Sequence, residues 1–516
     1  MHIVTHVRCF QADSLERDAL EILGLARSLK NTLAPINGIP SDVISLLPDY
    51  CDEGYADEFS INCTHVCRSW REIFVSRSSL WTNLDFKNVE KTRTYIQRSR
   101  CSPLNISLQK SSKDITYLDD AFSLVIPHIH RLKSLAIIAS VLPDVLSHFR
   151  CPTPLLEKLD IHIPFLAEPD SSRISGALFN GELPSLRELY LCGVITDLAW
   201  RNTWNLTVFT LSNPQDFKGF KLSVTQILDF FESAPFLQRV EFYYPFPNSS
   251  DAPPGRIVPL RRLKTLALGT HSPPSVLFNH LHIPTGAALM LCNRTKSEEF
   301  SPLDYLPDKF PNFENLSHIT MVNLCLARDT KSVRLGGPSG SLRLVSDLSD
   351  ARALPSATVD HRVLRSIGPP RLPTIQRLAV AEYTHTPQAG VEECPVFRTL
   401  CSLETLRTLV LFYSDTLPFI LALNPEKNSS EIVPCPNLEE LIIYPLSHPR
   451  HGDLVEMSRS RDSKGAKLSS IVIIDTQECS MEEEVSKLKE NVTHVEYRRE
   501  SYSFTRPGWD GVLDEW

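Results

Sequence analysis

Glycine is scarce in this chain, with 19 residues among 516, whereas soluble proteins use about 7%. Loops that cradle phosphates need closely spaced glycines, and neither a Gly-x-x-x-x-Gly-Lys-Ser/Thr loop nor a Gly-x-Gly-x-x-Gly turn occurs. A Gly-x-Ser-x-Gly elbow, a His-Glu-x-x-His helix and paired Cys-x-x-Cys motifs are also missing from the sequence. We therefore expect no catalytic residues, no metal ligands and no cofactor.

Two weaker candidates for chemistry remain. His448, His451 and Asp453 in "HPRHGD" could place three metal ligands near one another, but an exposed turn is the favoured interpretation. His65 lies two residues before Cys67, and residues two apart on a helix do not face each other. A thiolate pair is therefore not expected there.

An excess of positive charge is also missing. The chain has 53 Lys and Arg against 61 Asp and Glu, a net charge of -8, which argues against a nucleic-acid partner. The longest apolar run near the middle, "LAIIASVL", covers only 135–142, whereas a membrane span needs about 20 residues. The N-terminus lacks the basic and apolar regions of a signal peptide. We expect a soluble protein with no membrane partner.

Cysteine is present in an odd number, 13, without a pairing rhythm. Reduced thiols are the better interpretation for such a chain, which predicts a cytoplasmic or nuclear location. The 38 prolines fit a chain with many short, fixed connections.

Helical periodicity dominates the first hundred residues. Residues 12–30 predict an amphipathic helix that serves packing or, alternatively, binds a partner; its apolar positions are Leu15, Leu20, Ile22, Leu23, Leu25 and Leu29. A short helix should begin at Pro40 and end at Pro48. A longer one should begin at Phe59, because apolar residues recur at spacings of three and four: Phe59, Cys63, Val66, Cys67, Trp70, Ile73 and Phe74.

The ordered pieces of residues 39–86, "IPSDVISLLPDY…FSINCTHVCRSWREIFVSRSSLWTNLDF", resemble an F-box. The following "VEKTRTYIQRSRCSPLNISL" resembles the continuation of that segment in many fungal F-box proteins. The resemblance implies that ten residues face or support a Skp-type adaptor and, through it, a cullin-RING ubiquitin ligase: Ile39, Pro40, Val43, Leu46, Leu47, Val66, Cys67, Trp70, Leu80 and Trp81. Cys67 is then a small apolar group and not a nucleophile.

Two features depart from the F-box outline. Ile39 stands where leucine is usual, and the acidic stretch 48–58 looks inserted between the first two helices. The alternative is that residues 39–86 only form a helical cap over the next domain.

The remaining sequence repeats one motif, apolar-x-x-apolar-x-apolar. Its last apolar residue falls at Ile137, Ile161, Leu191, Leu211, Phe242, Leu268, Met321, Val380, Leu411, Ile443, Ile473 and Tyr497. The gaps from 268 to 321 and from 321 to 380 are about twice the usual step, and "ALMLCN" (288–293) and "SVRL" or "SLRLVS" (332–346) could fill them. Segments 225–235 and 481–492 suit helices.

The motif resembles that of leucine-rich repeats, whose period is about 20 to 29 residues. We therefore expect an α/β chain: an N-terminal amphipathic helix (1–35), an F-box-like helical domain (36–100), an irregular leucine-rich-repeat-like solenoid (101–500) with an insertion at about 326–370, and a tail (501–516). An ordinary doubly wound α/β domain is the rival, although such a sheet would rarely repeat one strand motif so often.

The predicted function is that of a non-catalytic substrate-recognition subunit of an SCF-type ubiquitin ligase. The F-box-like part would bind the Skp-type adaptor, and the repeats would bind a target protein whose identity the sequence does not disclose. One alternative is a repeat scaffold without a ligase role. Another is an enzyme with an unrecognised site between repeats.

Overall fold

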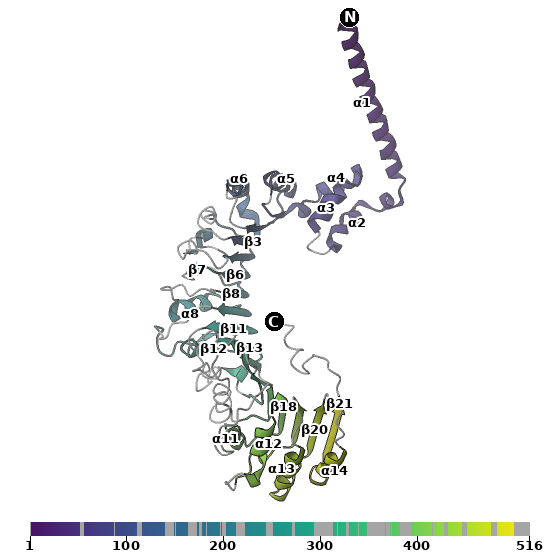
Figure 1. The fold of residues 1–516 in the computed structure, drawn as a ribbon. Coiled ribbons are helices and arrows are strands. Elements are labelled where there is room, and N and C mark those ends of the chain that lie inside the picture. Colours follow the sequence, from purple (N-terminus) through teal and green to yellow (C-terminus); the bar gives the residue numbers. More distant parts are fainter. Residues whose placement is uncertain are drawn as a thin grey trace. The chain divides into compact units, whose positions relative to one another are not determined.

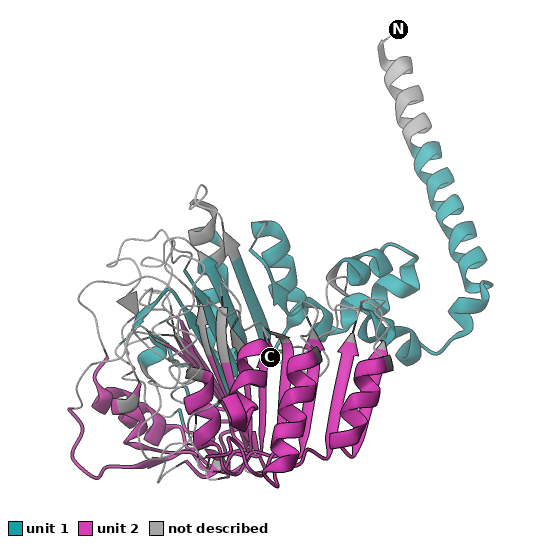
Figure 2. Ribbon diagram, turned by 60° about the horizontal axis from the view of Figure 1, so that its bottom comes forward, with its two compact units in different colours: residues 1–196, 200–203 teal, residues 197–199, 204–516 magenta. Residues whose placement is uncertain are grey.

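The computed structural model describes most of the chain outside the connecting segments. The longer described ranges are 2–51, 56–86, 88–110, 116–139, 151–163, 183–196, 203–212, 222–243, 251–270, 274–293, 318–326, 330–338, 340–347, 374–381, 395–414, 416–427, 432–445, 451–475 and 482–499, with shorter pieces at 149, 173–174, 178–181, 198, 313–316, 367 and 372. These residues fall into two compact units, 1–196 with 200–203, and 197–199 with 204–516 (Figure 2). The predicted tail 501–516 and His448 lie outside the described residues.

Short helices make up the N-terminal part of unit 1. The long helix α1 (His2–Thr32) is followed by a 3-10 turn, η1 (Pro35–Gly38), and then by α2 (Ser41–Ser45), η2 (Leu47–Tyr50), α3 (Ala56–Thr64), α4 (Arg68–Ser76) and η3 (Ser78–Trp81) (Figure 1). The helices predicted at 12–30 and from Pro40 are thus confirmed. The single helix predicted from Phe59 is wrong, because the chain breaks into α3 and α4.

Five parallel strands follow in unit 1, each paired with the next along the chain. They are β1 (Asn83–Leu84), β2 (Leu104–Lys110), β3 (Leu132–Ala139), β4 (Lys158–His162) and β6 (Glu188–Cys192). Two helices, α5 (Val89–Ser99) and α6 (Thr116–Val125), lie in the connections, and β5 (Arg173–Ile174) pairs separately with β7 (Ile195–Thr196). Wholly buried side chains alternate with partly exposed ones, as strand geometry requires.

Unit 2 continues the same pattern with parallel strands in two runs. The first run is β8 (Val208–Ser212), β9 (Arg239–Tyr243), β11 (Thr265–Thr270) and β13 (Ala288–Asn293). The second is β14 (Met321–Leu326), β17 (Arg377–Ala381), β18 (Thr408–Ser414), β19 (Glu440–Pro445), β20 (Ser470–Asp475) and β21 (His494–Arg499). β10 (Val258–Pro259) pairs apart from them with β12 (Leu281–His282).

An antiparallel hairpin joins the two runs of unit 2. β15 (Thr330–Gly337) pairs with β16 (Gly340–Asp347) on one side and with β14 on the other, and β16 pairs in parallel with β13. The strands predicted at 288–293 and 332–346 are therefore confirmed. The start of the segment 326–370, expected to be irregular, is a regular hairpin, and most of 348–370 lies outside the described residues.

Most repeat motifs coincide with these strands. In β18, for example, Leu409 and Leu411 are wholly buried and occupy the predicted inward positions. The motif "LSHITM" is the exception, because Met321 is 42% exposed and Val322 and Leu324 point inward instead. The described residues thus form a mixed α/β fold with mostly parallel strands, seven in unit 1 and fourteen in unit 2 when the short pairs β5–β7 and β10–β12 are included.

Helices connect several strands of unit 2 and cover one face of them. They are α8 (Val224–Ser233), α9 (Ser275–Phe278), α11 (Pro395–Ser402), α12 (Leu417–Leu423), α13 (His451–Ser463) and α14 (Glu482–Asn491). Figure 1 shows α12, α13 and α14 beside β18, β20 and β21. The helices predicted at 225–235 and 481–492 are confirmed. An exposed turn at His451 and Asp453 is wrong, because these residues begin α13.

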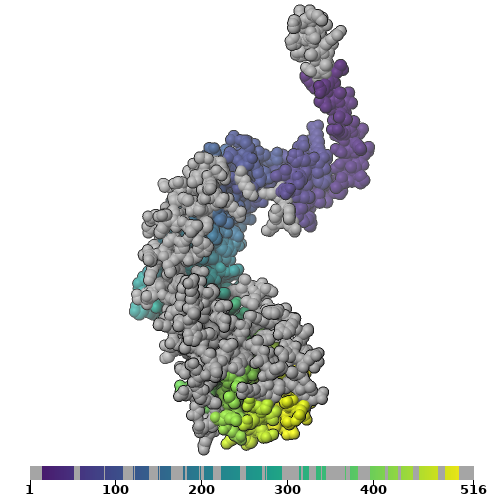
Figure 3. All heavy atoms as spheres, viewed as in Figure 1, coloured from purple at the N-terminus to yellow at the C-terminus, as the bar shows by residue number. Residues whose placement is uncertain are grey.

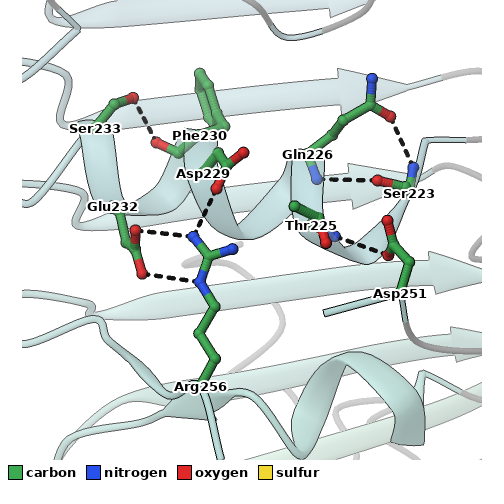
Figure 4. A network of polar contacts seen from close by, with 9 residues as sticks. All are labelled: Ser223, Thr225, Gln226, Asp229, Phe230, Glu232, Ser233, Asp251 and Arg256. Carbon is green, nitrogen blue, oxygen red and sulfur yellow. Dashed lines mark hydrogen bonds and ion pairs between the residues drawn. The ribbon is translucent and has the colours of Figure 1, made fainter. Parts of the chain in front are cut away.

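Helix α8 is fixed at both ends by polar contacts (Figure 4). Ser223 Oγ accepts a hydrogen bond from the Gln226 amide (3.1 Å) and the Gln226 side chain accepts one from the Ser223 amide (2.9 Å), which is a capping box. Near the other end, Arg256 donates to Asp229 at 2.6 Å and to Glu232 at 2.8 Å. These contacts tie the connection after β9 back onto the helix.

None of the helices among the described residues is long and apolar enough to cross a membrane.

Candidate functional site

Apolar side chains remain uncovered on the short helices of unit 1. Between one third and three fifths of the surface of each is exposed: Ile36, Ile39, Val43, Leu46, Leu47 and Val66. Pro40 is exposed as well. These seven residues, which we call the apolar surface, come from η1, α2, η2, the linkers beside them and the turn between α3 and α4. So many exposed aliphatic groups on a few short elements make this part of unit 1 a candidate binding site.

The local sequence explains why this surface faces outward. Pro40 is the N-cap of α2, and Asp42 follows in the first turn, where a negative charge is favourable. The helix has only five residues, and its one buried side chain is Ile44. Val43 and Leu46 lie on other sides of the helix and are left facing solvent. The α-helix ends at Ser45, and the 3-10 turn η2 follows from Leu47 with Pro48 as its second residue.

A small core beneath the surface holds these helices together. Ile44, Cys63, Trp70 and Phe74 are buried against one another, and partly buried residues complete the cluster: Phe59, Cys67, Ile73 and Leu80. The rings of Trp70 and Phe74 lie 5.7 Å apart. The Trp70 indole N–H donates to Asn37 Oδ1 at 2.8 Å, which fixes η1 to α4. The exposed residues therefore stand on a packed support.

The turn between α3 and α4 gives Cys67 and Val66 their positions. Cys67 is extended (φ −157°, ψ 174°) and is the N-cap of α4 without a capping bond from its side chain. Its sulfur packs against the small core while Val66 is exposed. A continuous helix would have placed Cys67 in the same stripe as Trp70, but the chain bends before it.

Arg77 links the end of α4 to α2 and η2. Its Nη1 donates to the carbonyl oxygen of Ser45, and its Nη2 lies 2.9 and 2.7 Å from the two carboxylate oxygens of Asp49. Because two nitrogens of one planar group are held, the orientation of the guanidinium is fixed. Asp49 belongs to the acidic stretch 48–58 that departs from the F-box outline, and here it pins η2. Residues 52–55 of that stretch lie outside the described residues.

Trp81 ties the helical cluster to the strands of unit 1. Its side chain is fully buried, and its N–H donates to the Phe74 carbonyl at 3.0 Å. The Tyr95 ring of α5 meets it edge to face at 5.1 Å, and the Arg98 guanidinium lies 4.4 Å from its ring centre. Trp81 therefore holds η3 and α5 together.

The ten residues predicted to face or support an adaptor are thus divided by the structure. Six are exposed: Ile39, Pro40, Val43, Leu46, Leu47 and Val66. Cys67 and Leu80 are half-buried, and Trp70 and Trp81 are buried in their own chain. The two tryptophans can support a partner's site only by holding the exposed residues in place.

Sequence reasoning missed four residues of this region. Ile36 and Tyr50 extend the exposed surface, and Asn37 and Arg77 hold it in place. No periodic signal marks Asn37 or Arg77, because their partners lie about 30 residues away in the sequence. Pro35 begins η1, and Pro40 is the N-cap of α2. These two prolines are the one sequence signal that indicates a fixed turn at Ile36.

A second candidate surface is the row of partly exposed side chains on the strands of unit 1. Lys158, Asp160 and His162 of β4 lie in register with Glu188, Tyr190 and Cys192 of β6. Lys158 Nζ is 3.5 Å from Glu188 and 5.1 Å from the Tyr190 ring centre. Burial raises the pKa of Asp160, while Lys158 and then His162 pull it down less strongly. The face is polar and mixed in charge.

The corresponding row in unit 2 is apolar between β17 and β20. Ala379, Val410, Ile442 and Val472 lie side by side in parallel register. Phe412 and Tyr444 follow in the next row, with ring centres 4.6 Å apart. Both faces of these strands therefore carry apolar side chains, as is typical of parallel strands that are covered on both sides.

Burial shifts the pKa of several cysteines among the described residues. No group of three or more described His, Cys, Asp or Glu residues could hold a metal ion. Burial raises the pKa of the Cys435 thiol to about 12, so this cysteine stays protonated. Burial likewise raises the pKa of Cys63 in the small core, with Cys51 adding to it. The apolar surface and the strand face are both candidates for binding a partner.

No family model and no curated protein matches this chain.

Proposed function

We propose that this protein is the substrate-recognition subunit of an SCF-type ubiquitin ligase. The observation that carries the proposal is the apolar surface on η1, α2 and η2, left exposed above the small core of Ile44, Cys63, Trp70 and Phe74. Together with the F-box-like order of residues 39–86, it suits a Skp-type adaptor that covers short apolar helices. The adaptor in turn brings the cullin-RING ligase.

The energetics set what such docking requires. Each apolar side chain of the surface is about half covered already, so covering the rest gains about 1 kcal/mol apiece. The total for the seven residues is about 7 kcal/mol, and association costs at least about 4 kcal/mol. Neighbouring contacts must therefore add to the binding, and Tyr50, 85% exposed, is well placed to supply one.

We also propose that the strands form an irregular solenoid of leucine-rich-repeat type. Apart from the short pairs β5–β7 and β10–β12, successive parallel strands within each unit are neighbours in the sheet, except β13 and β14, between which the hairpin β15–β16 is inserted. A doubly wound sheet reverses its strand order at a switch point, and this order favours the repeat interpretation. Backbone amides such as Arg187 N, which donates to Glu157 O at 2.8 Å, repeat the same link between successive turns.

The target protein would bind the partly exposed strand rows. The polar row on β4 and β6 offers a cation, a carboxylate and a phenol in fixed register, and this suits a protein surface of mixed charge. Catalysis is then a matter of proximity: the ligase supplies activated ubiquitin, and this chain raises the local concentration of the target. No step of bond making falls to its own residues.

Co-purification with a Skp-type adaptor tests the docking. We expect Val43→Asp with Leu47→Asp to abolish co-elution of the full chain with the adaptor, because two carboxylates would be buried without partners. Leu155→Asp is the matched control, since Leu155 is 46% exposed in the same unit but lies in the turn before β4. Circular dichroism of all three proteins checks that the fold is intact.

Co-elution that is absent in the unchanged chain, or equal in Val43→Asp/Leu47→Asp and Leu155→Asp, would contradict the ligase proposal. A scaffold without a ligase role would then be favoured. The observation that favours the scaffold is the burial of Trp70 and Trp81 inside their own chain, because a segment that served packing alone would also enclose them.

A further inference from the structure

Helix α1 exposes far more apolar surface than the rest of unit 1. From Ser14 to Thr32 every described side chain is exposed. Leu15, Ile22, Leu25 and Leu29 are 66–69% exposed, and Leu33 just beyond the helix is 78% exposed. In Figure 3 the coloured atoms of α1 are visible without other described atoms over them. A helix of this kind in water requires a partner for its apolar face.

The spacing of these residues shows which kind of partner fits. Leu15, Ile22 and Leu29 recur every seven residues, and Ala19, Ala26 and Leu33 recur every seven residues between them. Steps of four and three alternate along this seam, which is the pattern of the d and a positions of a coiled coil. Leu23 and Leu25 flank the seam, and Leu20 and Gly24 lie outside it. The pattern spans about three heptads.

We propose that α1 pairs with α1 of a second copy of this chain in an antiparallel coiled coil. With the two-fold axis at Gly24, each layer joins residues whose numbers add to 48. Leu15 then meets Leu33 of the other copy, Ala19 meets Leu29, and Ile22 meets Ala26. Large side chains face small ones in two of the three layers, so the helices can approach closely without leaving voids.

The flanking residues agree with the same register. Leu23 contacts Leu23 of the other copy on one side of the seam, and Leu25 contacts Leu25 on the other. The pairing therefore covers the five most exposed aliphatic side chains of this segment: Leu15, Ile22, Leu25, Leu29 and Leu33. Glu16 lies opposite Lys30 of the other copy. In a parallel pair, Lys30 would instead face Leu25 and Glu16 would have no basic partner. Charge and shape therefore both select the antiparallel arrangement.

Charge along the helix adds to this preference. Glu16, Asp18 and Glu21 lie in the N-terminal half of the described side chains, with Arg17 as the one opposing charge there, and Arg27 and Lys30 lie in the C-terminal half. An antiparallel pair puts each acidic half beside a basic half. Because a pairing of three heptads is short, the dimer should be weak and its population should rise with protein concentration.

The inference stands independently of adaptor docking, because it uses none of the residues of the apolar surface. If both hold, the dimer presents two strand ladders in one particle, which would raise the avidity for a target with two binding segments.

Sedimentation of the full chain over a range of concentrations tests the proposal. We expect a concentration-dependent dimer that Ile22→Asp weakens by about tenfold or more, because the carboxylate would enter the apolar seam. Leu20→Asp is the matched control: Leu20 is exposed to a similar degree, at 61%, but lies outside the seam, so the dimer should persist.

Two further variants test the register and do not depend on breaking the helix. Glu16→Lys alone should weaken the dimer, and Glu16→Lys with Lys30→Glu should restore it, which a parallel pair would not do. Gly24→Ala should strengthen the dimer, because a Cβ at Gly24 meets nothing within 4 Å and alanine favours the helix. A chain that stays monomeric at all concentrations, or equal effects of Ile22→Asp and Leu20→Asp, would overturn the proposal. So would loss of adaptor binding, in place of dimerisation, on Ile22→Asp.

Discussion

At the scale of single residues, buried charge in this protein is used to hold carbonyl groups. Arg461 of α13 is fully buried, and its guanidinium donates to the carbonyl oxygens of Pro434 at 2.7 Å and Cys435 at 2.8 Å. Arg131 does the same in unit 1 with the Ser102 carbonyl at 2.8 Å. Each planar guanidinium satisfies several acceptors of a connecting segment at once. Burial lowers the pKa of both arginines, which remain charged because an ordinary arginine titrates far above neutrality.

The pH dependence of stability tests the effect of partly burying the Asp160 carboxylate. Its pKa is raised in the folded protein, so between the ordinary aspartate range and the raised value the folded state binds more protons than the unfolded state. Stability therefore falls as the pH rises through that window. We expect Asp160→Asn to raise the melting temperature slightly at pH 7, and the gain to disappear below about pH 4.

Thermal unfolding at several pH values measures this. Asp120→Asn, an exposed carboxylate of the same unit, controls for the general loss of negative charge. A gain in stability that is equal at both ends of the pH range would contradict the assignment to burial.

At the scale of elements, the first residues of a helix fix where the connection between two strands becomes helical. Helix α8 begins with the capping box of Ser223 and Gln226, and α5 begins with Asn88, whose side chain accepts from Glu90 N and Lys91 N. Helix α4 has no such bond at Cys67. It is held by the burial of Trp70 and Phe74 instead, so packing rather than capping fixes its start.

Replacing the cap of α8 should have a measurable and local cost. Ser223→Ala removes the acceptor for the Gln226 amide, and we expect a loss of about 1 kcal/mol in the free energy of unfolding. Ser233→Ala, at the other end of the same helix, is the control, because its hydroxyl donates back to Phe230 O and caps no amide at the helix start (Figure 4). Denaturant titration of the two variants should rank Ser223→Ala as clearly the less stable; equal midpoints would contradict the role of the cap.

At the scale of the whole molecule, the helical cluster and the strands have separate apolar cores. Ile44, Cys63, Trp70 and Phe74 form a small core of their own, while the strands pack through residues such as Leu135, Leu159 and Leu189. A small core contributes little stability in total, since few side chains are enclosed. The cluster should therefore respond to change more readily than the strands do.

Phe74→Ala tests this separation. The side chain is fully buried, and its loss should cost about 3 to 5 kcal/mol, enough to unfold a small cluster. We expect adaptor co-elution to be lost while the main thermal transition of the strands stays within a few degrees. Leu409→Ala, in β18, should instead lower that transition. If Phe74→Ala lowers the main transition as much as Leu409→Ala does, the two cores are coupled.

The strands could be predicted from the sequence because their pattern is local. Leu159 and Ile161, or Leu441 and Ile443, alternate with polar residues after a fixed spacing, and period-two alternation needs no knowledge of the rest of the chain. The pattern failed at Met321, where the same three apolar letters occur one residue out of register. A shift of one residue turns every side chain to the other face, and only the pairing with Gly336 and Arg377 selects one register.

Local pattern is enough to predict the alternation, the helix-forming stretches and the apolar character of residues 39–86. Which of those apolar residues stay exposed depends on tertiary packing. Trp70 and Trp81, the strongest anchors in the sequence, are enclosed, because their partners Asn37, Phe74 and Tyr95 come from other elements. Val43 is exposed because the five-residue helix α2 buries only Ile44, and Leu47 is left exposed in the 3-10 turn that follows. Exposure depends on contacts between segments distant in sequence, and no local pattern contains them.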